Sequence, residues 1–310
     1  MNGKRVSMNK QILNMNGIVT VLNTPFTEED RIDIPSLRKH VNYALDSGVA
    51  GFLIPAMASE VDKLNEFERK LLVETVVGEV KGRVPVIGGA SAHTGAQRIF
   101  YAKQLIQLGC EGVLVSIPYV NDQQYEHDVR EIAELNPKFL MLQDWDFQGF
   151  GLPVPLISKL FKEIDVFRSL KIEVVPAGVK YSQVIEATGG QLHVAGGWAV
   201  SQIIEGLDRG VHAFMPTGMH EIYVKIYSLH RQGERDAAKE LFNRLLPVLS
   251  FANQHLDISI HFFKRLLFEQ NIYRTMRVRQ PILPFDGYHE TISKELTDYV
   301  IKLTEDLSRT

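Results

Sequence analysis

The segment VFRSLKIEVVPAG, residues 166–178, places a single lysine inside an apolar run. Its β-branched and aliphatic residues favour a short buried strand, and Pro176 with Gly178 ends it. Side chains alternate between the two faces of a strand, so Lys171 and Glu173 point to one face and Ile172 to the other. The sequence therefore predicts an amine and a carboxylate side by side within a buried strand.

Two interpretations of this pair are open. A buried lysine either pairs its charge or loses its proton, and a neutral amine is the nucleophile that forms Schiff bases with carbonyl compounds. A purely structural ion pair between Lys171 and Glu173 explains the same pattern. The rest of the chain has to decide between them.

Seven other apolar runs resemble this strand and alternate with amphipathic segments. They begin at Gly17, Ala50, Arg83, Gly112, Lys138, Leu192 and Val211. Their spacing of roughly 20 to 35 residues is typical of βα units. Eight such units predict an α/β fold, a closed parallel (β/α)8 barrel over residues 17–225. Residues 1–16 are expected to form a loosely held N-terminal arm, and the helical patterns of residues 226–310 predict a C-terminal helical extension.

Composition excludes several function classes. The chain has 310 residues, of which 45% are hydrophobic and 23% charged, with a net charge of −3. This is globular composition without the basic field that nucleic-acid binding needs. The single cysteine, Cys110, is expected to pack in the core of a cytoplasmic protein. Neither a membrane span nor the apolar core of a signal peptide is apparent.

Metal and nucleotide sites find little support in the sequence. His93 and His220 are isolated from other potential zinc ligands. The glycine pairs Gly88-Gly89 and Gly196-Gly197 lack the spacing of a dinucleotide-binding fingerprint. No cofactor and no metal are therefore predicted.

In a parallel barrel the chemistry lies at the carboxyl ends of the strands. Those ends bring together one amine, several carboxylates and two glycine pairs. The residues are Thr24, Ala56 to Glu60, Gly88 to Ser91, Pro118, Tyr119, Gln143, Asp144, Lys171, Glu173, Gly196, Gly197, Thr217 and Gly218. Such a mouth suits a small anionic carbonyl compound.

Several segments, in order, resemble one enzyme family. They are TVLNTPF, the LNEFER helix start, GRVPVIGGAS, the PY after the fourth strand, the lysine strand, VAGGWA and the glycine-rich end of the eighth strand. The chain, from about Gly17 to Asn253, is similar to the Schiff-base barrels of the dihydrodipicolinate synthase and N-acetylneuraminate lyase family. The resemblance implies a TIM barrel, an imine between Lys171 and a 2-oxo acid such as pyruvate, and a homo-oligomer, either a tetramer or a dimer.

Departures from the family pattern narrow the function. The family's second-strand loop reads Gly-Thr-Thr-Gly-Glu, whose hydroxyls and amides hold the substrate carboxylate, whereas this chain has AMASE at residues 56–60. Ser59 supplies one hydroxyl, and the backbone N–H groups of Ala58 and Ser59 are candidates to receive the carboxylate. Gln143 stands where the family has a proton-relaying tyrosine, and glutamine cannot titrate. Gln148 and Val120 replace an arginine and a second tyrosine, so true dihydrodipicolinate synthase activity is not expected.

The sequence therefore predicts a lyase, an aldolase or a dehydratase, that acts on a 2-oxo acid such as a 2-keto-3-deoxy sugar acid. For the proton shuttle, Glu173 is the first candidate, Glu60 the second and Asp144 the third. Tyr119 is a possible partial replacement for the missing tyrosine, and Gly196 and Gly197 are expected at the substrate. Trp145 and Phe147 are candidates for an apolar acceptor pocket. The alternative is a degenerate barrel that binds a 2-oxo acid or another metabolite without turnover.

Overall fold

The chain forms the predicted barrel. The computed structural model describes residues 13–308, and within them eight parallel strands close in sequence order, with β1 paired to both β2 and β8. The strands are β1 (Gly17–Val21), β2 (Gly51–Leu53), β3 (Val86–Gly89), β4 (Gly112–Val115), β5 (Phe139–Asp146), β6 (Phe167–Val174), β7 (His193–Gly196) and β8 (Ala213–Phe214).

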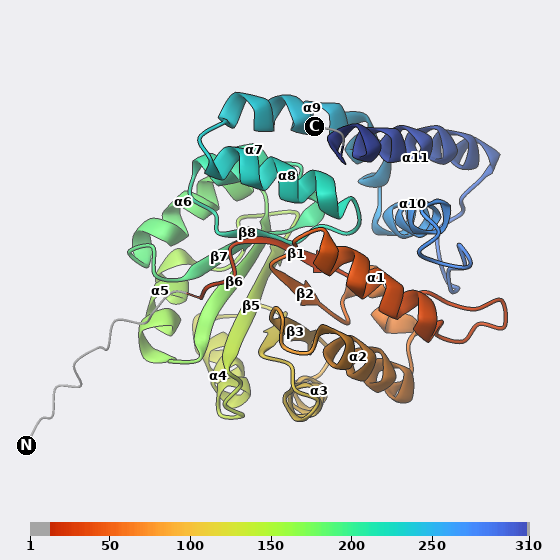
Figure 1. Ribbon diagram of the computed structural model, residues 1–310. Helices are drawn as coiled ribbons and strands as arrows, with labels where there is room; N and C mark the ends of the chain where they lie inside the picture. The colour runs from red at the N-terminus through yellow and green to blue at the C-terminus, as the bar shows by residue number, and fades with distance from the viewer. Residues whose placement is uncertain (1–12, 309–310) are drawn as a thin grey trace, which may run out of the picture.

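Helices follow the strands and surround the barrel (Figure 1). They are α1 (Ile34–Asp46), α2 (Glu66–Val80), α3 (Gly95–Gln107), α4 (Asp122–Ala133), α5 (Val154–Glu163), α6 (Ala177–Ala187), α7 (Ile203–Asp208) and α8 (His220–Arg231). The start of α2 is the expected capping box, because Asn65 accepts a hydrogen bond from the N–H of Glu68 and the Glu68 carboxylate accepts one from the N–H of Asn65. No helix among residues 13–308 is long and apolar enough to cross a membrane.

Strand alternation separates the interior of the barrel from its outer surface. Inward side chains such as Val19, Leu114 and Met141 form one buried cluster, while their neighbours in sequence pack under the helices in a second, larger cluster. Lys171 belongs to the inward set, since Ile172 packs in the outer cluster. The predicted face of the lysine is therefore correct.

The amino-terminal end of the barrel is closed by a small polar group. His193 contacts the hydroxyl of Ser169 at 2.8 Å and the carbonyl oxygen of Met15 at 2.9 Å. Burial lowers the pKa of His193 to about 4, so a neutral imidazole holds residue 15 in place. Residues 1–12 of the predicted N-terminal arm lie outside the described residues.

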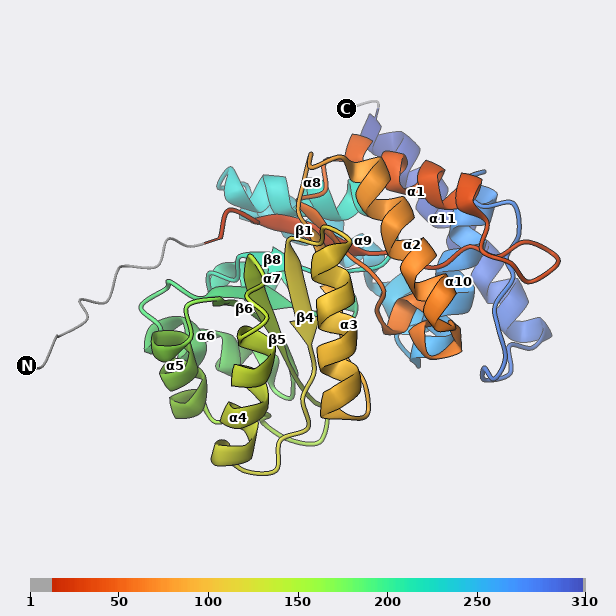
Figure 2. The same cartoon turned by 90° about the horizontal axis from the view of Figure 1, so that it is seen from below.

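The C-terminal extension consists of α9 (Arg235–Ala252), α10 (Leu256–Glu269) and α11 (Gly287–Ser308), which lie together beside the barrel (Figures 1 and 2). The predicted boundary at residue 225 falls within α8. A buried ion pair joins extension to barrel: the ammonium of Lys264 on α10 contacts the carboxylate of Glu60, which also accepts the backbone N–H of Arg279 at 2.9 Å. The extension thereby fixes the loop that follows β2.

Candidate active site

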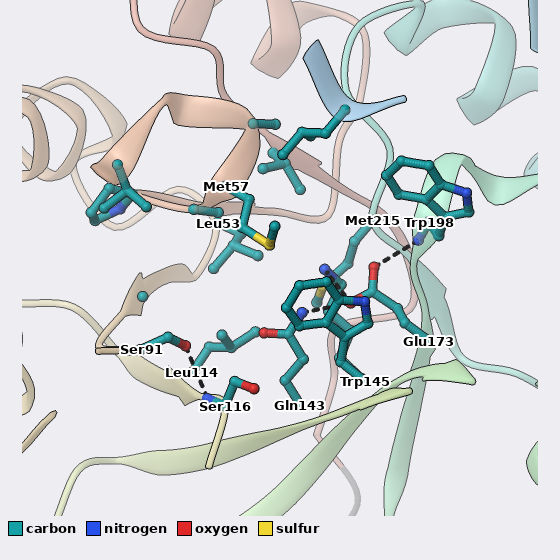
Figure 3. A pocket seen from close by; sticks show the side chains of 18 of the residues that line it. Leu53, Met57, Ser91, Leu114, Ser116, Gln143, Trp145, Glu173, Trp198 and Met215 are labelled. Carbon is teal, nitrogen blue, oxygen red and sulfur yellow. Dashed lines mark hydrogen bonds and ion pairs between the residues drawn. The ribbon is translucent and has the colours of Figure 1, made fainter. Parts of the chain in front are cut away.

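A cavity of about 630 Å³ opens at the carboxyl ends of the strands, where the sequence placed the chemistry. Its walls include side chains from β1 to β6, the loops after them and helices α9 and α10 (Figure 3). Lys171 and Glu173 both line it. A cavity of this size encloses a small metabolite and keeps most solvent out.

The amine and the predicted proton shuttle lie in contact. Lys171 Nζ is 3.1 Å from Glu173 Oε2, and the two side chains are 9% and 8% exposed. The adjacent β5 presents Gln143 opposite Lys171, and its amide nitrogen donates to Glu173 Oε2 at 2.6 Å. The second oxygen of Glu173 accepts the backbone N–H of Trp198 at 2.7 Å. Glu173 is therefore held from three sides.

These donors decide the charge of Glu173. Burial by itself raises the pKa of a carboxyl group, but the Lys171 ammonium and the hydrogen bonds from Trp198 and Gln143 outweigh burial and lower the pKa of Glu173 below its ordinary value of 4.5. Glu173 is a carboxylate at neutral pH. It can accept a proton from a bound substrate or from the lysine ammonium.

A strained turn after β7 supplies the N–H of Trp198. Trp198 and Val200 have φ angles of +28° and +52°, a region that side chains with a Cβ rarely occupy. Gly197 precedes them, and a Cβ at this position would lie 2.2 Å from Glu173 Oε1. The glycine therefore permits the close approach between the turn and the carboxylate.

Aromatic side chains form the outer part of the cavity. Trp145 and Phe147, the predicted acceptor-pocket residues, both line it and meet edge to face with ring centroids 5.7 Å apart. Phe147 also contacts Trp198, at 5.4 Å between centroids. An apolar rim of this kind excludes water from a bound substrate.

Tyr119 and Asp144, which were expected at the substrate, do not line the cavity. Tyr119 is 45% exposed and donates its hydroxyl to Asp122, which raises the pKa of the tyrosine, so it is a poorer proton shuttle than a free phenol. Asp144 points out of the barrel, as strand alternation dictates, and pairs at 3.2 Å with the buried Lys180 of α6. Neither side chain lines the cavity.

Glu60 and Ser59 are also engaged elsewhere. Glu60 is buried in its ion pair with Lys264 and does not line the cavity, so its expected roles as a substrate contact and a proton shuttle are not supported. The hydroxyl of Ser59 donates to the carbonyl of Leu22, and its N–H donates to the carbonyl of Ala56 within the turn η1 (Met57–Ser59). Ser59 has no N–H left for a carboxylate. Ala58, by contrast, lines the cavity.

The glycine pair after β7 has separate roles. A Cβ at Gly196 would collide with Phe214 and with the hydroxyl of Tyr181, which shows that this residue packs behind the strand. Gly197 contacts Glu173, as described above. Gly197 thus supports the carboxylate through the turn, Gly196 allows the packing of β7, and neither residue lines the cavity.

Sequence reasoning missed two contributions to the site. The first is the Trp198 N–H, which depends on a backbone turn and has no side-chain signal. The second is the wall from the C-terminal extension, made by Leu249, Asn253, Leu256, Ser259 and Phe263. The sequence indicates that α10 has an apolar face, but the periodicity of apolar residues does not show which part of the barrel that face covers.

Known proteins with similar sequences include two enzymes that match over most of this chain. L-2-keto-3-deoxyarabonate dehydratase of Azospirillum brasilense is 26% identical over 276 residues, 86% of this chain and 88% of that protein. 4-Hydroxy-tetrahydrodipicolinate synthase of Oceanobacillus iheyensis is 28% identical over 251 residues, 78% of this chain and 84% of that protein.

Solved structures agree in fold as well. The crystal structure of dihydrodipicolinate synthase from Rhodopseudomonas palustris superimposes with a TM-score of 0.85 over 94% of this chain and 99% of that one, at 21% identity. The model of the dihydrodipicolinate synthetase family matches residues 14–299. Since the family model spans nearly the whole barrel and its extension, this chain belongs to the dihydrodipicolinate synthetase family.

Proposed function

We propose that this protein is a Schiff-base lyase that dehydrates a 2-keto-3-deoxy sugar acid through an imine at Lys171. The observation that carries the proposal is the contact of 3.1 Å between Lys171 Nζ and the Glu173 carboxylate inside the cavity. A nucleophilic amine and a base within hydrogen-bond reach are the two groups that imine chemistry requires.

The first step joins the substrate to the lysine. Glu173 accepts a proton from the Lys171 ammonium, and the free amine attacks the C2 carbonyl carbon. A C2=N bond replaces the C2=O bond, and Glu173 returns its proton to the departing oxygen, which leaves as water while the carboxylate is restored. The protonated imine then draws electrons from the neighbouring C3–H bond.

Dehydration follows with the same carboxylate. Glu173 takes the C3 proton, the C4–O bond breaks, and the hydroxyl group leaves as water with a proton returned by Glu173. Glu173 can deliver the proton that it takes from C3 to the leaving C4 hydroxyl. One carboxylate therefore serves as the base and then as the acid. Hydrolysis of the remaining imine releases the product and regenerates Lys171.

The choice of dehydration is supported by the relative from Azospirillum brasilense, whose name specifies a dehydratase for L-2-keto-3-deoxyarabonate and which covers 86% of this chain. Cleavage of the C3–C4 bond uses the same lysine and carboxylate, and its products, pyruvate and an aldehyde, distinguish it from dehydration. Self-association as a homo-oligomer and a cytoplasmic location stay predictions.

The test is borohydride reduction in the presence of pyruvate, followed by mass spectrometry of wild type and Lys171→Met. Wild type is expected to gain a reduced pyruvate adduct at Lys171, whereas the variant gains none. A matched control is Lys159→Met, because Lys159 lies half-exposed on α5, and this variant should be labelled like wild type.

Product analysis with L-2-keto-3-deoxyarabonate completes the experiment. The expected product is the dehydrated 2-oxo acid, which is about 18 mass units lighter than the substrate because one water molecule is lost. Absence of any adduct, with pyruvate and with larger 2-oxo acids, would overturn the proposal in favour of a binding protein.

A further inference from the structure

One layer at the carboxyl end of the barrel carries polar side chains on β5 and β6 and on the segments that follow β3 and β4. Gln143 on β5 is directly opposite Lys171 on β6, and Val115 on β4 is opposite Leu142, so Ser116 comes level with Gln143. The N–H of Ser116 donates to the hydroxyl oxygen of Ser91, at 2.9 Å, in the segment after β3. Ser91, Ser116 and Gln143 therefore extend sideways from Lys171 in one row, and all three line the cavity.

The orientation of the Gln143 amide is fixed by chemistry. Glu173 Oε2 also faces the Lys171 ammonium at 3.1 Å and therefore acts as an acceptor, so the group of Gln143 that faces it at 2.6 Å is the amide NH2. The carbonyl oxygen of Gln143 consequently points away from Glu173, toward the side of the cavity where Ser91 and Ser116 lie (Figure 3). It presents an acceptor to whatever binds there.

The opposite side of the cavity has a different character. Leu53, Met57 and Met215 line it from β2, from η1 and from the segment after β8, and Figure 3 shows them across the cavity from Ser91 and Ser116. A ligand attached at Lys171 thus meets hydrogen-bonding groups on one side and apolar groups on the other. This asymmetry discriminates between ligands with and without hydroxyl groups.

We propose that Gln143, Ser116 and Ser91 form a hydroxyl-recognition row that selects 2-oxo acids hydroxylated beyond C3. The order of the row follows the order of the substrate chain. The C4 hydroxyl, two bonds from the imine carbon, donates to the Gln143 carbonyl oxygen on the strand next to the lysine. The C5 hydroxyl exchanges hydrogen bonds with Ser116, one strand further, with Ser91 behind it.

This inference rests on the proposed imine at Lys171, and the test separates the two. Imine formation is measured by borohydride trapping, and the readout is the 2-oxo acid concentration that gives half-maximal trapping. The probes are L-2-keto-3-deoxyarabonate and its 5-deoxy analogue, 4-hydroxy-2-oxopentanoate, which lacks only the C5 hydroxyl. The proteins are wild type, Ser116→Ala and the control Ser158→Ala, whose hydroxyl donates to Ala187 outside the cavity.

Wild type and the control are expected to need about 3- to 10-fold more of the 5-deoxy analogue than of the full substrate, the range for one net hydrogen bond. Ser116→Ala should lose this preference because its half-maximal concentration rises for the full substrate and stays constant for the analogue. A general packing defect would shift both probes equally, and that result overturns the recognition row while leaving the imine in place. Failure of trapping with both probes and with pyruvate overturns the proposed function and the row together.

Discussion

Glu173 combines two demands that usually fall on separate side chains. It is ionised although buried, and the proposed reaction requires it to exchange protons with the substrate. Three donors, from Lys171, Gln143 and the Trp198 N–H, meet the first demand. Gln143, which stands where the family resemblance implies a titratable tyrosine, leaves the second demand to the carboxylate in the proposed reaction, because an amide supports a charge but does not transfer a proton.

The acid limb of the pH profile should report this arrangement. With its pKa lowered below 4.5, Glu173 stays ionised until the pH falls beneath that value, so activity in wild type should be lost only below pH 4.5. Gln143→Met removes one donor to the carboxylate and raises the pKa of Glu173, so the acid limb of kcat/KM should move to higher pH. The measurement is kcat/KM against pH.

The control for this shift is Gln107→Met, an exposed position at the end of α3, which should keep the wild-type profile. The midpoint is the relevant quantity, since loss of a substrate contact at Gln143 lowers the amplitude at every pH. An unchanged midpoint in Gln143→Met would show that another group governs the acid limb.

At the scale of elements, β5 uses its two faces for different purposes. Gln143 points inward to the reaction, and Asp144 points outward to Lys180. Lys180 also donates to the carbonyl oxygens of Phe150 and Leu152, while Asp144 accepts the N–H of Leu152 at 2.8 Å. This cluster fastens the loop between β5 and α5, which begins with Phe147 at the cavity rim.

Removing the lysine tests this fastening. Lys180→Met leaves the Asp144 carboxylate buried without its cation, and the expected loss of unfolding free energy is about 3 to 5 kcal/mol. The double variant Asp144→Leu with Lys180→Met should recover most of it, because an apolar pair removes the stranded charge. Urea unfolding provides the measurement.

Lys159→Met again serves as the comparison, since Lys159 forms a half-exposed ion pair with Glu126. Its effect should stay below about 1 kcal/mol. If Lys180→Met were as mild as Lys159→Met, the buried pair would not be what holds the β5–α5 loop.

The same elements show what sequence can and cannot predict. Alternation along β6 correctly placed Lys171 and Glu173 on one face, because side-chain direction in a strand is a local property. The same alternation along β5 turns Gln143 inward and Asp144 outward. The partner of Glu60 was not predictable, since Lys264 is 204 residues away and only the packing of α10 brings it close. The position of the Tyr119 hydroxyl was not predictable either, because it depends on the conformation of the loop after β4, which turns the hydroxyl toward Asp122.

For the whole molecule, barrel and extension behave as one folding unit. Buried side chains of α9 and α10, such as Leu245 and Phe262, belong to the same core cluster as those of the barrel strands. The Glu60 and Lys264 pair adds a polar connection between the two parts. The extension therefore shares the larger core cluster with the barrel, whereas the smaller, inward-facing cluster contains no residue of α9, α10 or α11.

Unfolding should therefore be a single cooperative transition. Cys110, the only cysteine of the chain, is buried between α3 and β4 and reports on the barrel alone. The helical circular dichroism signal comes from the helices of both the barrel and the extension. The loss of this signal and the labelling of Cys110 by a thiol reagent should therefore show the same urea midpoint. Labelling of Cys110 at a midpoint different from that of the helical signal would indicate that the extension unfolds separately.

The strained turn and the aromatic rim have one more consequence. The chain contains two tryptophans, Trp145 and Trp198, and both line the cavity and contact Phe147. Tryptophan fluorescence of this protein, excited selectively where tyrosine does not absorb, thus originates from two side chains that line the cavity. The arrival of a ligand can be followed without any added dye, and every change in the tryptophan emission belongs to one of two known positions.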